Sequence, residues 1–157
     1  MSGNWRDSSG AAIRPPIAWA LALIGGFALD WLYRLPFLPT AMPAGALGGI
    51  VFLAGLALLV WAAGTFRRAG TQIQTTRPTS TIVEEGPYRF TRNPIYIGMF
   101  LGLIGVAIAI DSLWLILVLV PFYLVIRYGV VAREEAYLER KFGDVYLAYK
   151  ARVRRWL

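Results

Sequence analysis

The chain has 157 residues, of which 57% are hydrophobic and only 16% charged, which is too apolar for a soluble domain of this size. It contains no cysteine and no histidine, which excludes disulfides, thiolate chemistry and cysteine-ligated zinc and removes the commonest general base. The net charge of +7 does not indicate nucleic acid, because the basic residues cluster at the ends of apolar segments. We therefore expect an integral membrane protein without a metal site and without a nucleic-acid partner.

Four apolar runs each approach the ~20 residues needed to cross a hydrocarbon core of ~30 Å. They cover residues 16–35, 43–66, 94–110 and 113–128. These runs predict an all-α integral membrane fold with about four transmembrane helices. Residues 1–12 are rich in Gly, Ser and Asn, so we expect a disordered N-terminus there and a single domain over residues 13–157.

Some polar and small residues of these runs indicate packing rather than chemistry. Asp30 and Arg34 are four residues apart, and we expect them to form an ion pair near the outer membrane interface. Glycines in the second and third runs permit close approach of neighbouring helices: Gly45, Gly49, Gly55, Gly98 and Gly102.

The distribution of basic residues predicts the topology. Arg and Lys cluster before the first run, between the second and third runs, and after the fourth run, whereas the two other connections carry only Arg34 and Asp111. The positive-inside rule therefore places both termini and the loop 67–92 in the cytoplasm. We expect the remaining basic surface to hold anionic lipid headgroups.

The polar loop 67–92 leads directly into the third helix, and a connection of this length is usually functional. Asn93 is the expected N-cap of that helix and Pro94 its first residue. The free N–H groups and the dipole of such a helix start favour an anion, such as a carboxylate or phosphate. The alternative to an anion site is a helix cap at the membrane interface, with arginines that serve only the positive-inside rule. Four more side chains converge within about one turn of this start: Tyr88, Arg89, Arg92 and Tyr96.

The fourth helix is expected to leave the bilayer without interruption and to end at Gly143. Beyond the bilayer it carries Glu134 and Glu135, which form either a solvated stem or a second part of the site. Glu135 and Glu139 are like charges at i,i+4, which a cationic partner would relieve. Arg127 lies seven residues before Glu134, so we expect the two to share a helical face and to point toward the arginine-rich loop.

The last segment, residues 144–157, is predicted to be an amphipathic helix lying along the inner membrane interface. Its apolar residues are spaced by three or four on one face: Tyr146, Tyr149, Val153 and Trp156.

Three sequence stretches together resemble the membrane-embedded methyltransferases that include isoprenylcysteine carboxyl methyltransferase and the phospholipid N-methyltransferases. They are Gly-Pro-Tyr-Arg-Phe-Thr-Arg-Asn-Pro-Ile-Tyr-Ile-Gly (86–98), the acidic pair 134–135, and Phe-Gly-Asp-Val-Tyr-Leu-Ala-Tyr (142–149). The resemblance covers roughly the last 75 residues, and the combination, order and spacing of the motifs are specific. Upstream, Ala-Gly-Thr-Phe (63–66) is similar to the helix end that precedes the cofactor loop in phospholipid methyltransferases.

This resemblance implies S-adenosylmethionine (S-adenosyl-L-methionine) as methyl donor, bound at the cytoplasmic face between the loop and the C-terminal helices. Arg92-Asn93-Pro94 matches the Arg-His-Pro cofactor motif of the family, with Asn93 in place of the common histidine, and Glu134–Glu135 matches its acidic pair. The implied catalytic residues are Arg92 and Glu134. The implied cofactor-binding residues are Tyr88, Arg89, Arg92, Asn93, Pro94, Tyr96, Gly98, Glu134 and Glu135.

The chemistry of these residue types agrees with that role. Methyl transfer from a sulfonium needs alignment and exclusion of water rather than a metal. Glu134 and Glu135 can accept from the cofactor's ammonium or ribose hydroxyls, Arg89 or Arg92 can hold its carboxylate, and nearby tyrosines can pack on the adenine.

Two acceptor chemistries remain open, and in both a hydrophobic tail enters sideways from the bilayer. A prenyl-type carboxylate is already a nucleophile, which suits a chain without histidine, whereas a lipid ammonium must first lose a proton to a carboxylate. The resemblance implies phospholipid chemistry at this point, because Asn-Pro in place of His-Pro also occurs among the phospholipid methyltransferases. We therefore expect a membrane-dissolved lipid or isoprenoid acceptor, and the alternative is a non-catalytic lipid-binding or scaffold protein with the same fold. The sequence carries no signature of oligomeric state.

Overall fold

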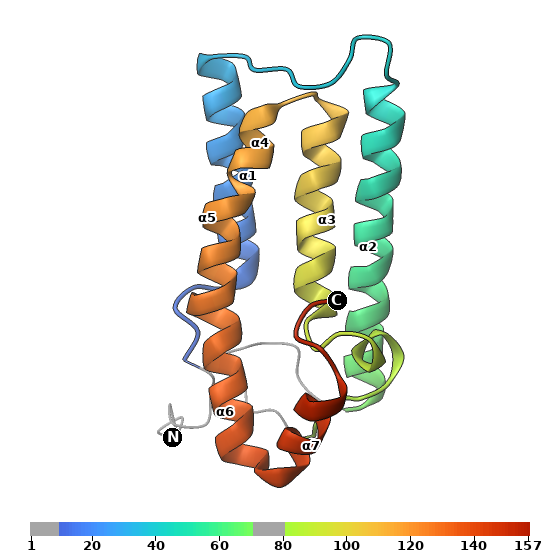
Figure 1. Ribbon diagram of the computed structural model, residues 1–157, viewed down its shortest axis with the longest axis vertical. Helices are drawn as coiled ribbons and strands as arrows, with labels where there is room; N and C mark the ends of the chain where they lie inside the picture. Colours follow the sequence, from blue (N-terminus) through green and yellow to red (C-terminus); the bar gives the residue numbers. More distant parts are fainter. Residues whose placement is uncertain (1–9, 71–80) are drawn as a thin grey trace.

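The computed structural model describes residues 10–70 and 81–157, and all regular elements in these residues are helical (Figure 1). The predicted all-α class is confirmed. In chain order the elements are α1 (Pro15–Leu32), α2 (Ala44–Arg68), the 3-10 turn η2 (Gly86–Arg89), α3 (Pro94–Ala109), α4 (Leu113–Leu117), α5 (Leu119–Leu124), the π-helix η3 (Val125–Val131), α6 (Ala132–Phe142) and α7 (Asp144–Arg152).

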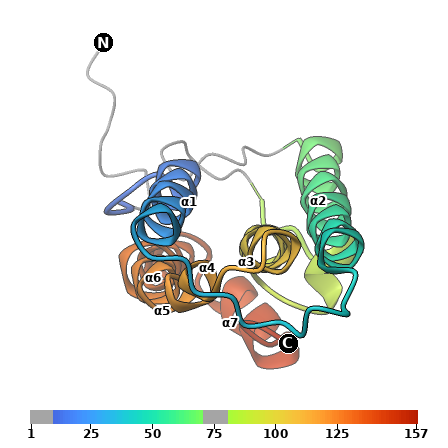
Figure 2. The ribbon, with the colours of Figure 1, turned by 90° about the horizontal axis from the view of Figure 1, so that it is seen from above.

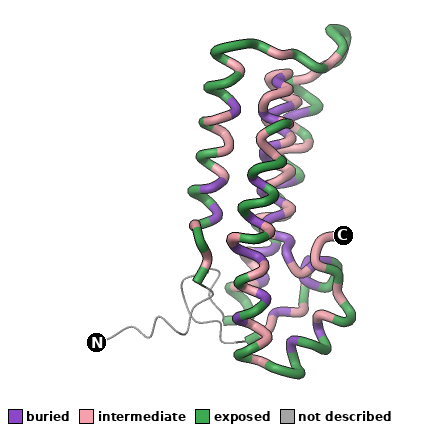
Figure 3. The backbone as a smooth tube through the Cα atoms, turned by 60° about the vertical axis from the view of Figure 1, so that its left-hand side comes forward, coloured by how far each residue is buried: buried purple, intermediate pink, exposed green. Residues whose placement is uncertain are grey.

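Within residues 10–70 and 81–157, three helical segments are long and apolar enough to cross a membrane: α1, α2 and the rod of α4, α5, η3 and α6 that runs from Leu113 to Phe142. Helix α3 is also apolar but has only 16 residues, or ~24 Å of length. Exposed positions recur along these helices (Figure 3), and many are large and apolar, such as Ile24, Leu53 and Val60. Such a surface is stable against lipid rather than water. The chain is therefore an all-α membrane protein.

Helix α3 is central and packs tightly on α2 through glycines (Figure 2). A Cβ added at Gly48 would overlap the backbone of Gly105, and one at Gly55 would lie 2.7 Å from the carbonyl oxygen of Gly98. The two helix backbones therefore approach too closely for any side chain at these positions. Two glycines that were expected to pack have no atom within 4 Å of an added Cβ instead: Gly45 and Gly49.

Trp19 of α1 closes the space between α1 and α3. Its indole Nε1 donates to the carbonyl oxygen of Met99 at 2.9 Å. Its ring lies against Gly102, where an added Cβ would be 3.5 Å from the nearest ring atom. Behind it, α3 and the rod share an apolar core whose members include the fully buried Leu103, Ile126 and Val130.

At the end of the bundle opposite α7, the predicted ion pair between Asp30 and Arg34 is wrong. Helix α1 ends at Leu32, so Arg34 is not placed one turn after Asp30, and it donates to the carbonyl oxygen of Ile110 at 3.4 Å. The turn there is built by Asp111, which has a φ of 53°. Its carboxylate accepts two backbone N–H groups of the α1–α2 connection, at 2.9 and 2.8 Å.

Residues 1–9 of the expected disordered N-terminus and residues 71–80 of the expected loop lie outside the described residues. The segment just before α1 is held against the rod. The Ala12 N–H donates to the carbonyl oxygen of Gly129 at 2.9 Å, and Arg133 donates to that of Gly10 at 2.8 Å. Gly129 lies within η3, whose wide turns shift the register between the apolar rod and the acidic pair.

Candidate functional site

Helix α7 folds back beneath the bundle and brings the end of the chain to the start of α3 (Figure 1). Gly143 makes this reversal possible, because its φ of 51° is a conformation that side-chain-bearing residues rarely adopt. The chain after α7 then pairs with the segment before α3 in an isolated parallel bridge between Thr91 and Arg154. The segment before α3, α6 and the C-terminal residues thus meet at one end of the bundle.

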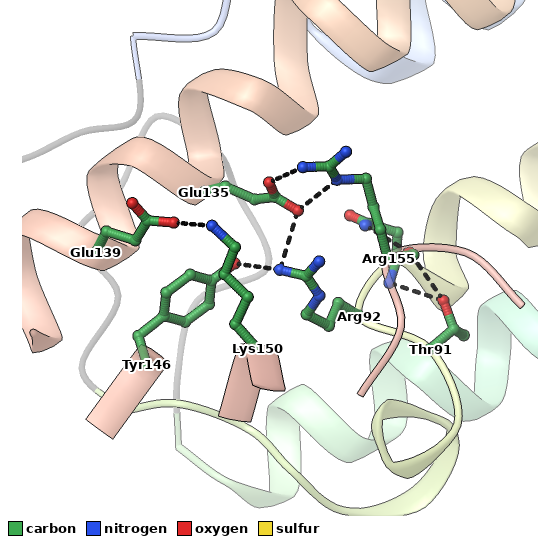
Figure 4. Close-up of polar contacts among 8 residues, drawn as sticks. Thr91, Arg92, Glu135, Glu139, Tyr146, Lys150 and Arg155 are labelled. Atoms are coloured by element: carbon green, nitrogen blue, oxygen red, sulfur yellow. Dashed lines mark hydrogen bonds and ion pairs between the residues drawn. The ribbon is translucent and has the colours of Figure 1, made fainter. Parts of the chain in front are cut away.

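Glu135 of α6 is the centre of a buried charge cluster (Figure 4). Arg155 binds it with two parallel hydrogen bonds, Nε to Oε1 at 2.8 Å and Nη2 to Oε2 at 2.6 Å. Arg92 approaches the same Oε1 at 3.2 Å and also donates to the hydroxyl of Tyr146 at 3.3 Å. The side chains of Arg92 and Glu135 are only 8% and 10% exposed, so these charges depend on one another for compensation.

The backbone of the C-terminal residues is fixed to the same place. The Arg92 N–H donates to the carbonyl oxygen of Arg154 at 2.9 Å. The carbonyl oxygen of Arg155 accepts from the Thr91 hydroxyl at 3.1 Å and from the Asn93 side-chain amide at 2.9 Å. Asn93 is the N-cap residue of α3 as expected, but its side-chain amide makes no cap hydrogen bond and instead holds the C-terminal segment.

Glu134 is adjacent to Glu135 but has different partners. The hydroxyl of Tyr96, on the first turn of α3, lies 2.9 and 3.0 Å from the two carboxylate oxygens of Glu134. Within the described part of the chain, Glu134 makes no ion pair. The oxygens of Glu135 are therefore occupied by arginines, whereas the neighbouring Glu134 can still accept a hydrogen bond from a cation or a hydroxyl.

Two buried polar atoms near this cluster have no hydrogen-bond partner among the described residues: the hydroxyl of Tyr88 and Nε of Arg92. Tyr88 is held by its backbone, since its carbonyl oxygen accepts from the Tyr149 hydroxyl at 2.8 Å. Burial raises the pKa of Tyr146 to about 12, so this tyrosine is a neutral hydroxyl at physiological pH. Buried polar atoms without partners are costly, and a bound polar ligand would satisfy them.

The i,i+4 repulsion of the glutamates is relieved as expected, because Lys150 of α7 forms an ion pair with Glu139 and the arginines neutralise Glu135. Arg127 does not point toward the loop, however. Its guanidinium lies over the ring of Tyr128, 5.2 Å from the centroid. The seven-residue spacing from Arg127 to Glu134 crosses η3, whose wider turns break the regular α-helical register.

Three other predicted site residues lie away from the charge cluster or serve packing. Arg89 is exposed, and its side chain makes no hydrogen bond or ion pair with the residues that the structure describes. Pro94 is buried and begins α3, where its missing N–H costs nothing. Gly98 lies beneath α2, where an added Cβ would be 2.7 Å from Leu59. Of the predicted set, the structure brings together Arg92, Asn93, Tyr96, Glu134 and Glu135, with Tyr88 beside them.

The sequence predicted a C-terminal contribution to this site but not the residues that make it. In the sequence, Arg155 was one of the basic residues that the positive-inside rule places in the cytoplasm. The fold shows that it also binds Glu135. The spacing of Tyr146 and Tyr149 did predict a common face. That face packs on the site rather than on the membrane interface, with both tyrosines buried. The expected placement of this face along the inner interface is therefore wrong.

Comparison with known proteins gives one family and one similar chain. The family described as phospholipid methyltransferase matches residues 43–145. An uncharacterized protein of Haemophilus influenzae is 48% identical over 64 residues, which is 38% of this chain and 100% of that protein. No solved structure matches.

Proposed function

Because the chain belongs to the phospholipid methyltransferase family, we propose that it transfers a methyl group from S-adenosylmethionine to a membrane-dissolved lipid or isoprenoid acceptor. The observation that carries this proposal is that one end of an apolar bundle holds both a cation and an anion whose hydrogen-bonding capacity is incompletely used. Arg92 has an unpartnered Nε, and Glu134 has no cationic partner, within the described residues. We further propose that this end and both termini face the cytoplasm, which the clustering of basic residues supports.

The donor set fits the amino-acid part of such a cofactor. A zwitterion needs one cationic and one anionic partner, and the cluster offers the Arg92 guanidinium and the Glu134 carboxylate. Glu135 is the less available acceptor, because Arg155 and Arg92 already occupy its oxygens. Tyr88, buried with a free hydroxyl, can face the cofactor's base or ribose. When bound, S-adenosylmethionine supplies an electrophilic methyl group on a sulfonium.

The protein's own residues would then align the acceptor and exclude water. For a carboxylate acceptor, Arg92 can orient the anion and no base is needed. For a lipid ammonium, a base must accept the proton, and Glu134 is the carboxylate of the cluster without a cationic partner. The hydroxyl of Tyr96 holds Glu134 in place from the start of α3 in either case. Glu134 can thus serve as the base in a chain that has no histidine.

Cofactor binding separates this proposal from a non-catalytic lipid-binding or scaffold protein. Calorimetric titration of the detergent-purified protein with S-adenosylhomocysteine should show binding. Glu134→Gln should weaken it by about 1.5–3 kcal/mol, the contribution of a hydrogen bond to a charged group. Glu85→Gln is the matched control, because Glu85 is exposed and lies in the segment before η2. Absence of binding by the unmodified protein would favour the non-catalytic alternative.

A further inference from the structure

Three aromatic rings close the side of the bundle between α3 and α5, and we call them the aromatic seam: Phe100, Tyr123 and Trp156. Phe100 comes from α3, Tyr123 from α5, and Trp156 from the residues after α7. Their centroids are 6.2 Å (Phe100–Tyr123), 6.2 Å (Phe100–Trp156) and 5.9 Å (Tyr123–Trp156) apart. The seam is therefore filled by side chains, one of which belongs to the end of the chain.

Two other sides of α3 are closed in other ways, one by direct contact of helix backbones and one by a hydrogen-bonded side chain. Between α2 and α3 the backbones touch at Gly55 and Gly98, with no side chain between them. Between α1 and α3 the indole of Trp19 is hydrogen-bonded to Met99 within the apolar core. The aromatic seam differs, because ring contacts alone fill it: Phe100 contacts Tyr123, Trp156 and also Phe122 of α5, 4.9 Å away. Of these rings, Trp156 alone comes from outside α3 and α5, so its displacement would uncover one side of Phe100.

The seam adjoins the charged site. Phe100 follows Tyr96 by four residues on α3, so the two share a face and lie ~6 Å apart along the helix axis. Trp156 directly follows Arg155 and packs against the core cluster that contains Tyr96. A lipid chain passing between α3 and α5 at Phe100 would therefore bring its headgroup to the Tyr96–Glu134 pair.

The C-terminal segment changes character within this stretch. The backbone carbonyls of residues 154 and 155 accept three hydrogen bonds from the segment before α3, and Arg155 binds Glu135. Beyond them, Trp156 and Leu157 make no hydrogen bond or ion pair with any described residue, and Leu157 is 80% exposed. The anchor thus ends at Arg155, and only apolar contacts hold the indole of Trp156 in the seam.

We propose that the aromatic seam is the entrance of the acceptor lipid and that Trp156 is its gate, which swings about the anchored Arg155. This inference rests on the proposed function. The occupant is a lipid with an acyl or isoprenyl chain, because the seam is apolar, Tyr123 is 40% exposed on the outside of the bundle, and the charge cluster lies behind it. The headgroup passes inward to Glu134 while the chain stays between α3 and α5.

A reversible cross-link tests the gate, because the chain has no native cysteine. In the double variant Tyr123→Cys/Trp156→Cys, a short cleavable bifunctional thiol reagent would fix the C-terminus across the seam. The locked protein should bind S-adenosylhomocysteine as the uncross-linked double variant does, should lose most methyl transfer from labelled S-adenosylmethionine into lipid, and should recover it on cleavage. Tyr33→Cys/Trp114→Cys, cross-linked at the opposite end, where Trp114 donates to the Tyr33 carbonyl at 2.7 Å, should keep its transfer.

Equal transfer by the locked and cleaved forms would overturn the gate. Failure of the unmodified protein to bind S-adenosylhomocysteine would instead overturn the proposed function. A second measurement needs no activity: Phe100→Cys should react faster with a lipid-soluble maleimide when combined with Trp156→Ala. The same combination with Trp31→Ala, which removes an indole that is 86% exposed at the far end of α1, should leave the rate unchanged. Equal rates in all three proteins would show that Trp156 does not cover the seam.

Discussion

Glu135→Gln should destabilise the folded protein, whereas Glu134→Gln, one residue earlier, should leave its stability nearly unchanged. Glu135 is 10% exposed and compensates Arg92, which is 8% exposed, and Arg155, which is 29% exposed. Removing one partner of a buried ion pair costs about 3–5 kcal/mol, and we expect the lower end because Arg155 can turn toward water. The amide of Gln at position 134 still accepts from Tyr96, so its cost should stay within about 0.5 kcal/mol.

Reversible unfolding of the detergent-solubilised variants measures both free energies. The double variant Arg92→Gln/Glu135→Gln should recover part of the loss, since it removes the buried charge that the single variant leaves without compensation. Equal stability of the Glu134→Gln and Glu135→Gln proteins would refute the assignment of Glu135 as the centre of a buried charge cluster. A greater loss in the double variant would refute it as well.

Three further predictions concern packing, pH and topology. Gly48→Ala should destabilise the bundle by about 1–3 kcal/mol in the same unfolding assay because its Cβ would overlap α3, while Gly49→Ala, in open space, should be neutral or slightly stabilising. The raised pKa of Tyr146 means that its stabilising contribution is fully present below about pH 10 and is lost as the pH rises toward about 12. In Tyr146→Phe, the free energy of unfolding should therefore depend less on pH between these two values than in the unmodified protein. Single cysteines at Met42 and Glu85 should be labelled from opposite sides of the membrane, and same-side labelling would contradict the proposed topology.

Hydropathy and helix-start signals predicted most of the fold. Apolar runs of transmembrane length became helices, and Pro94 begins α3 as expected, because both depend on local sequence. The register of the rod was not predictable in the same way. No residue pattern in the sequence predicted the π-helix η3. For a regular α-helix, the spacing from Arg127 to Glu134 indicates a shared face, and this face does not form because η3 lies between the two residues.

The site was predicted from two residue clusters beside the C-terminal helices, and the structure shows which C-terminal residues take part in it. Arg92 and the acidic pair were identified from the sequence, but the local pattern around Asn93 favoured a helix cap. Its amide instead binds the carbonyl of Arg155, a contact 62 residues away in sequence. Gly143 explains why this pairing was missed: its left-handed turn sends α7 and the C-terminus back to the start of α3, and that path depends on tertiary packing.

Transfer of labelled methyl groups from S-adenosylmethionine into a total lipid extract tests the proposed function most directly. The unmodified protein should transfer label. Arg92→Lys should lose most of this activity while inserting normally, because lysine has no counterpart of the unpartnered Nε that Arg92 keeps while its Nη1 contacts both Glu135 and Tyr146. Arg140→Lys, at an exposed position of α6, should behave as the unmodified protein. Equal activity of the Arg92 and Arg140 variants, or no transfer by the unmodified protein, would contradict a catalytic role for this site.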